Sequence, residues 1–185
     1  FRLDNGKYAI KQHSFMPEDK LYERMNSDRV PFDLWAKQGY LTMTPGAVVD
    51  YSFVEQYILD LSNKGYNIQE INYDKWNATH FAQIMEDHGF TMVEIPQSIR
   101  HLSEPTKAFR RNVFNKNIIH FDDPLLNWAI GNAVIRMDAQ ENIMLDKSKS
   151  SERIDPIAAI INAFSRAMSG QSRDLSSHFL KNWSL

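Results

Sequence analysis

The sequence of 185 residues contains no cysteine, which excludes disulfide bonds, thiolate nucleophiles and cysteine-ligated zinc sites. It has only seven glycines, and no two of them have the spacing of a Walker A loop or of a dinucleotide-binding fingerprint. No apolar run approaches the roughly 20 residues of a membrane span, and no signal-peptide pattern opens the chain. These absences exclude a P-loop ATPase and a thiol enzyme from this sequence.

The charge is almost balanced, with 21 Lys and Arg residues against 23 Asp and Glu residues and a formal net charge of −2. Nucleic-acid binding through bulk charge alone is therefore excluded, whereas a local basic groove is not. A hydrophobic content of 43% and a charged content of 24% are typical of a globular protein. The length suits one domain over residues 1–185. Because the chain begins at Phe1 inside what looks like a strand, we expect it to be a fragment of a longer protein.

Strand and helix patterns alternate along the middle of the chain. Residues 1–15 have the pattern of a hairpin whose turn is Asp4-Asn5-Gly6. Further strands are expected at residues 41–43, 67–73, 91–95, 118–121 and 142–146. Helices are expected at residues 53–61, 76–88, from Ser103 onward, 123–137 and 156–168. This order predicts an α/β fold with a mixed central sheet flanked by helices.

Two aspartates occupy positions where a cation site could form. Asp74 follows the strand expected at 67–73, and ligands gather at the carboxyl ends of strands in open α/β sheets. Asp155 precedes Pro156 at the start of the last apolar helix. Carboxylate oxygens suit hard divalent cations such as Mg²⁺, and a strand end can meet a helix start in space. On spacing alone, however, each residue could also be an ordinary helix N-cap, and this alternative is stronger for Asp155 than for Asp74. Asp123 is also expected to cap a helix.

Basic side chains form two clusters. Lys107, Arg110, Arg111 and Lys116 recur at three- and four-residue spacing on one expected helix face. Lys147, Lys149 and Arg153 lie in a polar loop that ends just before Asp155. Either cluster could be a solvated surface. Alternatively, basic side chains beside a metal site would bind the phosphate backbone of a nucleic acid that passes it.

Six segments, in order along the chain, resemble the C-terminal nuclease domain of the large terminase subunit of tailed bacteriophages. One of them contains Ile71-Asn72-Tyr73-Asp74-Lys75-Trp76. The six segments are residues 30–35, 41–51, 71–78, 97–107, 120–132 and 147–159. Each segment is modest alone, but together they make the resemblance specific over about residues 1–170.

The resemblance implies a ribonuclease H-like fold and an endonuclease that cuts concatemeric double-stranded viral DNA during genome packaging. It implies two Mg²⁺ or Mn²⁺ ions, with Asp74 and Asp155 matching the second and third carboxylates of the family's acidic cluster. The first carboxylate and the first strand are expected upstream of Phe1, since Asp4 does not match that position. Asn132 is a weaker candidate for the edge of the site.

Through the same resemblance, Lys107, Arg110, Arg111, Lys147, Lys149 and Arg153 are expected to contact DNA. The expected partners are DNA, the phage portal, the small terminase subunit and an ATPase domain of the same protein lying upstream, in the host cytoplasm and with no membrane. Two alternatives stay open. One is a catalytically incomplete nuclease remnant that binds DNA or the portal. The other is an unrelated small-molecule α/β enzyme, which would need a deep pocket.

Overall fold

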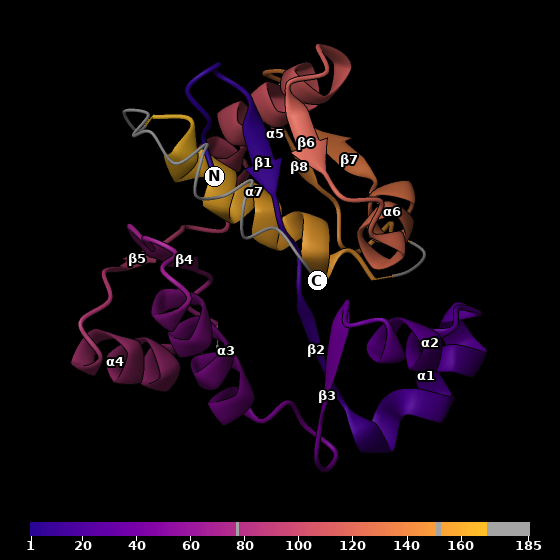
Figure 1. The fold of residues 1–185 in the computed structure, drawn as a ribbon. Helices are drawn as coiled ribbons and strands as arrows, with labels where there is room; N and C mark the ends of the chain where they lie inside the picture. The colour runs from indigo at the N-terminus through magenta and orange to yellow at the C-terminus, as the bar shows by residue number, and fades with distance from the viewer. Residues whose placement is uncertain (77, 151–152, 170–185) are drawn as a thin grey trace.

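The structure is a computed structural model that describes residues 1–76, 78–150 and 153–169 (Figure 1). Its strands are β1 (Tyr8–Ile10), β2 (Ser14–Pro17), β3 (Leu41–Thr44), β4 (Ile71–Tyr73), β5 (Met92–Glu94), β6 (Ile118–His120), β7 (Ile135–Met137) and β8 (Ile143–Leu145). Its helices are α1 (Leu21–Asp28), α2 (Phe32–Lys37), α3 (Tyr51–Asn63), α4 (Thr79–Asp87), α5 (Ile99–Phe114), α6 (Pro124–Gly131) and α7 (Asp155–Ala167), with a short 3-10 turn, η1 (Glu18–Lys20), before α1. None of the described helices is long and apolar enough to cross a membrane.

The strands pair two by two. The pairs β1–β6, β2–β3 and β4–β5 are parallel, and β7–β8 is antiparallel. The mixed α/β character predicted from the sequence is thus confirmed, but within the described ranges the strands form four two-stranded sheets instead of one continuous central sheet. Each strand has only three or four residues. Helices α5 and α7 pack on each other, and they contact β8 and β4 respectively (Figure 1).

The main core lies between α5, α7 and the strands beside them. On α7 the apolar residues Ile157, Ile161 and Phe164 recur at helical spacing and are buried. The ring of Phe164 lies 4.8 Å from that of Tyr8 on β1 and 5.4 Å from that of Phe109 on α5, measured between centroids. Helix α7 therefore packs against both β1 and α5 and holds them together.

A second core holds the lower right part of the molecule in Figure 1, around β2, β3, α1 and α2. Its buried members are Met16, Phe32, Trp35, Leu41 and Leu125. Leu125 comes from α6, which reaches this core from the other end of the chain. The contact joins the second core to the α6–α7 region.

The β4–α4–β5 unit is attached to the main core through α7. Helix α7 packs on β4, and Nε of Arg166 on α7 lies 2.9 Å from Oε1 of Glu70, just before β4. The helix α3 that precedes this unit is capped by Asp50, whose Oδ1 accepts a hydrogen bond from the N–H of Ser52. The carboxyl end of β4, where Asp74 lies, is thereby positioned against α7.

Three sequence predictions need correction. The helix expected from Ser103 begins at Ile99, with Ser98 as its cap and Pro105 in its interior. Pro105 cannot donate a backbone hydrogen bond, but burial of this helix face outweighs the loss. The helix expected over 123–137 ends at Gly131, because residues 135–137 form β7 and pair with β8.

The third correction concerns the hairpin expected over residues 1–15. Its turn forms, since Gly6 has a φ of +76° and donates its N–H to the carbonyl of Leu3, and Arg2 bridges Tyr8 in antiparallel fashion. After the turn, however, the extended stretch divides into β1 and β2. These strands pair with β6 and β3, which local pattern could not indicate.

The histidine between β1 and β2 makes stability depend on pH. The ring of His13 stacks on Tyr57 with centroids 4.4 Å apart, and its Nε2 lies 2.7 Å from Oγ1 of Thr42. Burial, and to a lesser degree the charge of Lys11, lowers the pKa of His13. The unfolded chain therefore takes up this proton at a higher pH than the folded chain, and the stability that neutral His13 contributes is lost as the pH falls below its ordinary value of about 6.5.

We expect His13→Gln to flatten the acid side of the stability profile. Urea unfolding at pH 7.5 and pH 5 should show a smaller drop in the free energy of unfolding for the variant than for the wild type. An equally steep drop in both proteins would show that His13 takes up its proton freely in the folded state.

Candidate functional site

A cavity of about 310 Å³ lies at the carboxyl end of β4. Its walls come from α5, β7, β8 and α7 and from the segments that follow β4, β5 and β8. These parts are far apart in the sequence but adjacent in the fold. Its polar lining residues are Asp74, Gln97, Thr106, Arg136, Asp146, Lys147, Ser148 and Asn162. Two carboxylates and two cations thus border one hollow.

Asp74 is half-buried at the rim of this cavity. Its Oδ1 accepts a hydrogen bond from the N–H of Trp76 at 3.1 Å, which closes a tight turn directly after β4. The N-cap of α4 is Ala78, so Asp74 shapes the turn and does not cap the helix. Asp74 is therefore a carboxylate at the end of a strand and beside a cavity, as its interpretation as a cation ligand requires.

Asp146 is the second carboxylate of the cavity, and the sequence interpretation missed it. It follows β8 directly and is only 6% exposed. Its Oδ1 accepts hydrogen bonds from the backbone N–H of Ser148 at 3.1 Å and from the Ser148 hydroxyl at 2.6 Å. The Ser148 hydroxyl, more than any other group, holds the pKa of Asp146 below its ordinary value, so the side chain is anionic at neutral pH. Its pattern, an aspartate ending a strand, is the one that marked Asp74.

Two amide side chains complete the polar wall. Gln97 follows β5 and donates from Nε2 to Oδ1 of Asn162 at 3.1 Å and to the carbonyl of Ile95 at 2.9 Å. Asn162 is buried on α7 with 9% of its surface exposed. These hydrogen bonds fix the end of β5 to α7 and keep two neutral amides next to the carboxylates.

Asp155, the other predicted ligand, opens α7 but lies outside the lining of the cavity. It is exposed, and the N-cap position belongs to Ile154, so the cap interpretation does not describe it. Asp155 and Asn162 are seven residues apart and share one face of α7, and Ala158 between them lines the cavity. Asp155 therefore stands on the cavity-facing side of the helix, at the end nearer α1.

An arginine pair surrounds that end of α7. Arg153 forms an ion pair with the largely buried Asp28 of α1, with Nε 2.9 Å from Oδ2. Burial and the charge of Arg153 lower the pKa of Arg24, whereas Asp28 and Asp155 oppose that shift, which places Asp155 within electrostatic reach of Arg24. Across residues 1–76, 78–150 and 153–169, no group of three or more His, Asp or Glu side chains is arranged to hold a metal.

The basic residues predicted to contact DNA divide between two places. Lys147 lines the cavity, and the charge of Lys149 helps to lower the pKa of Asp146, after the Ser148 hydrogen bonds. Arg153 is committed to Asp28. Arg136, which the sequence interpretation did not select, also borders the cavity and contacts the sulfur of Met144 at 3.1 Å. Residues 151–152 of the predicted basic loop lie outside the described residues.

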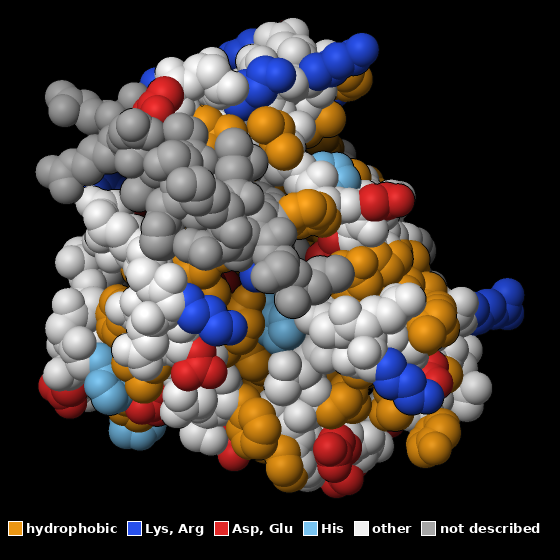
Figure 2. Space-filling model, in the orientation of Figure 1, with side chains coloured by type: hydrophobic (Ala, Val, Ile, Leu, Met, Phe, Trp, Pro, Cys, Tyr) orange, Lys and Arg blue, Asp and Glu red, His pale blue; other side chains and the backbone are white. Residues whose placement is uncertain are grey.

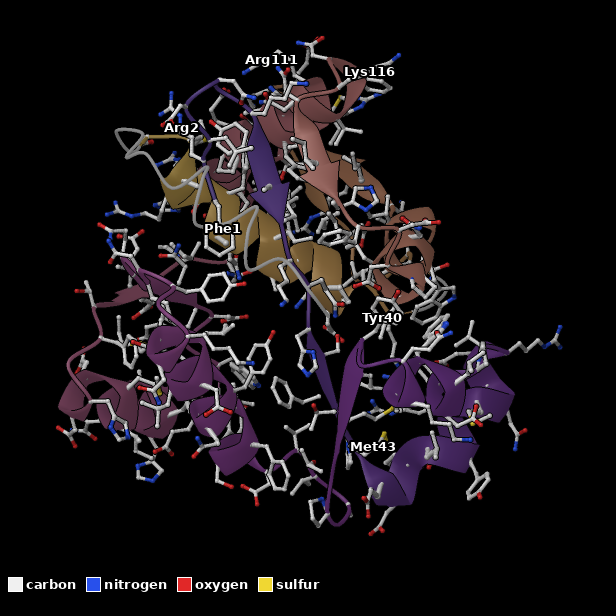
Figure 3. The ribbon with its side chains drawn as sticks, viewed as in Figure 1. Phe1, Arg2, Tyr40, Met43, Arg111 and Lys116 are labelled. Atoms are coloured by element: carbon white, nitrogen blue, oxygen red, sulfur yellow. The ribbon has the colours of Figure 1, made fainter. Side chains whose placement is uncertain are left out.

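The basic face of α5 lies at another end of the molecule. Figure 3 shows Arg111 and Lys116 at the outer end of α5 and the turn into β6, and Figure 2 shows Lys and Arg side chains gathered at the top of the same view. Arg111 lies 3.7 Å from Glu104, and the guanidinium of Arg110 stacks over the ring of Phe114. Lys107 is half-buried and helps, after Asn142, to lower the pKa of Asp138.

Asn132, the weaker candidate, terminates α6 as its C-cap residue. Its side-chain Nδ2 is buried with no hydrogen-bond partner among the described residues. It is outside the lining of the cavity, so the described geometry does not bring it to the two carboxylates.

The sequence model of the terminase large subunit endonuclease domain matches residues 1–171. The chain belongs to this family. The terminase large subunit of Enterobacteria phage HK97 is 31% identical over 159 residues, which are 85% of this chain and 31% of that protein. Protein YmfN of Escherichia coli K12 is 28% identical over 187 residues, covering 96% of this chain and 40% of that protein. The chain thus spans between about a third and two-fifths of the length of these relatives.

A solved structure agrees with the family assignment. The crystal structure of the HK97 bacteriophage large terminase matches 89% of this chain and 35% of that chain, with a TM-score of 0.81 and 29% identity. The resemblance drawn from the six segments is confirmed. The family description names an endonuclease domain, which favours a nuclease over a small-molecule enzyme of the same fold class.

Proposed function

We propose that this chain forms the nuclease centre of a viral packaging motor, which cuts concatemeric double-stranded DNA with the help of divalent cations. One observation carries the proposal beyond family membership: Asp74 and Asp146, from the ends of two strands 72 residues apart, border the same cavity. Carboxylates converging from distant strand ends are what a metal-assisted phosphodiester hydrolase requires.

The donor set fits a hard cation. Mg²⁺ prefers oxygen ligands, keeps several waters and is usually held by one or two carboxylates together with substrate phosphates. Asp74 and Asp146 would supply those carboxylates, with the buried Asn162 amide beside them. Two ions would need a further ligand, and Asp155 is the candidate, together with the carboxylate that the resemblance places upstream of Phe1. When bound, the cations would activate water and neutralise charge on the phosphate.

The cations of the chain have a matching role. Lys147 and Arg136 border the cavity and would hold the DNA backbone next to the two carboxylates. Lys107, Arg110 and Arg111, at the other end of the molecule, would hold a more distant stretch of the DNA. Lys149 would extend the contact along the loop before α7, and Arg153 would join it by leaving its ion pair with Asp28. Because such contacts are mostly with phosphates, we propose binding with little sequence readout and a strong dependence on salt. The portal, the small terminase subunit and an ATPase domain remain proposed partners, in the host cytoplasm.

Metal dependence is the first property to test. Incubation of this chain with supercoiled plasmid and Mn²⁺ should give nicked and linear products on an agarose gel, EDTA should stop the reaction, and excess Mn²⁺ should restore it. Cutting that continues in EDTA would overturn the cation-dependent mechanism.

A catalytically incomplete remnant that binds DNA or the portal is the second candidate. It is favoured by the finding that no group of three or more potential ligands is arranged to hold a metal within the described part of the chain. In the same assay, the remnant predicts a folded chain that retards DNA in a salt-sensitive way but leaves the plasmid intact at every metal concentration. Cutting by the chain would remove this candidate.

A further inference from the structure

Trp76 is the most exposed large apolar side chain in the described residues, with 82% of its surface in solvent. It follows Asp74 by two positions, in the turn after β4. Tryptophan has a large apolar body and is seldom left so open to water, so packing within the described chain gives no reason for its place. A contact outside the chain would give one.

The turn that carries Trp76 is held from both sides. The N–H of Trp76 donates to Asp74 Oδ1 at 3.1 Å, and Nζ of the preceding Lys75 lies 3.3 Å from Oε2 of Glu94 on β5. The hydrogen bond ties the backbone under the indole to the carboxylate at the cavity. The ion pair brings the Lys75 side chain to the neighbouring strand.

A second hollow of about 280 Å³ adjoins the main cavity at this turn. Asp74 and Gln97 line both, and the outer hollow adds Lys75, Trp76 and Glu94. The indole thus borders an open space whose wall shares Asp74 and Gln97 with the cavity of the two carboxylates. A DNA strand bound in the inner cavity would have its neighbouring nucleotides close to the indole.

We propose that Trp76 stacks on an unpaired base of the DNA strand whose backbone enters the Asp74 cavity. The inference rests on the proposed function, and it specifies the substrate: DNA that is locally unstacked, at a nick, a frayed end or a melted step. Bases inside an intact duplex are already stacked on one another and offer no face to an indole. Aromatic side chains beside a positive charge are the usual platform for single-stranded nucleic acid. Lys75 would supply that charge by exchanging its exposed ion pair with Glu94 for a phosphate.

A protein partner explains the surroundings less well. Apart from Trp76, the apolar residues of the outer hollow are Ile95, which is buried, and Pro96. Protein-binding hot spots lie in well-packed pockets ringed by contacts that exclude water, whereas here the indole stands in the open among Asp74, Lys75 and Glu94. This setting fits a nucleotide with its base on the ring and its phosphate toward Lys75 and the inner-cavity cations Arg136 and Lys147.

The test measures binding in EDTA, so that no cutting interferes. Fluorescence titrations of the chain with a single-stranded oligothymidine and with a blunt duplex of equal length would compare the wild type with Trp76→Ala and Trp76→Phe. We expect the single strand to quench the wild type and the quenching to shrink in both variants. Trp76→Ala should weaken single-strand binding roughly 5- to 150-fold, the range for one base–aromatic stack, and duplex binding by much less. Trp76→Phe should recover part of the affinity.

Tyr22→Ala is the matched control, because Tyr22 is 79% exposed and lies on α1, away from both hollows. It should bind both DNAs like the wild type. Equal loss of single-strand and duplex binding in Trp76→Ala, or no loss of either, would overturn the stacking contact, and the second result would leave a protein partner as the explanation. A chain that cuts plasmid normally while Trp76→Ala keeps its single-strand affinity overturns only the stack. A chain that never cuts but shows the Trp76-dependent preference overturns only the nuclease.

Discussion

Replacing Asp74 with asparagine should abolish metal-dependent cleavage while leaving the chain folded. Asparagine keeps the size and the oxygen that accepts the N–H of Trp76, so the turn after β4 should persist. It removes the negative charge that holds a cation, and cation assistance contributes several kcal/mol to the transition state of hydrolysis. At about 1.4 kcal/mol per tenfold, the loss should be roughly a thousandfold or more in the single-turnover cleavage rate.

The control is Asp87→Asn at the end of α4, an exposed aspartate of the same β4–α4–β5 unit. It should cut at the wild-type rate. Circular dichroism and the thermal unfolding midpoint should match among the three proteins. Normal cutting by Asp74→Asn with Mn²⁺ would remove Asp74 from the site and with it the proposed mechanism.

The same assay separates the other two carboxylates. Asp146→Asn and Asp155→Asn are both expected to lower cleavage severely, Asp146 because it shares the cavity with Asp74 and Asp155 because the resemblance matches it to a family ligand. Isothermal titration with Mn²⁺ should show weaker binding in each. If Asp146→Asn cuts at the wild-type rate, the role of Asp146 is structural, namely to organise the turn through Ser148. If Asp155→Asn cuts at the wild-type rate, Asp155 acts only through its charge beside Arg24 and not as a metal ligand.

Local signals predicted the parts of the fold that local physics decides. The apolar spacing of Ile157, Ile161 and Phe164 predicted α7 within one residue at each end. Asp123 was expected to cap a helix, and its Oδ1 accepts the N–H of Leu126 at 3.0 Å. The segment after Gly131 was misjudged, because a strand of three residues is stabilised by its partner β8 and leaves almost no pattern of its own.

For a related reason, the sequence predicted only one of the two carboxylates that border the cavity. Asp74 could be selected because a strand, a turn and a helix surround it in the order that marks a ligand edge. Asp146 has the same local pattern but was counted only as the last residue of the strand expected at 142–146. The pairing of β8 with β7 and the packing of β8 on α5 bring it to the cavity. Pairings such as β1 with β6, more than a hundred residues apart, depend on the whole chain and not on any window of it.

Phe164→Ala should cause the largest loss of stability. Phe164 is 4% exposed, and its ring packs edge-on against Tyr8 and Phe109, so it joins β1, α5 and α7 at one point. Removing a buried phenyl ring costs about 3–5 kcal/mol through lost burial and the cavity left behind. Since whole domains are stable by only about 5–15 kcal/mol, urea unfolding should show the midpoint falling steeply.

Phe114→Ala is the matched control, the same chemical change at a phenylalanine that is 71% exposed at the end of α5. It should cost no more than about 1 kcal/mol, since surface substitutions usually change stability little. The two variants also bear on the site. Asn162, Ala158 and Ile161 line the cavity from the helix that Phe164 anchors, so the cleavage rate of Phe164→Ala should fall at temperatures that leave Phe114→Ala unaffected. Parallel melting of the two variants would mean that α7 is held by contacts other than this aromatic cluster, and the rigidity of the cavity wall would then have to come from the Gln97–Asn162 hydrogen bond and the Arg166–Glu70 ion pair.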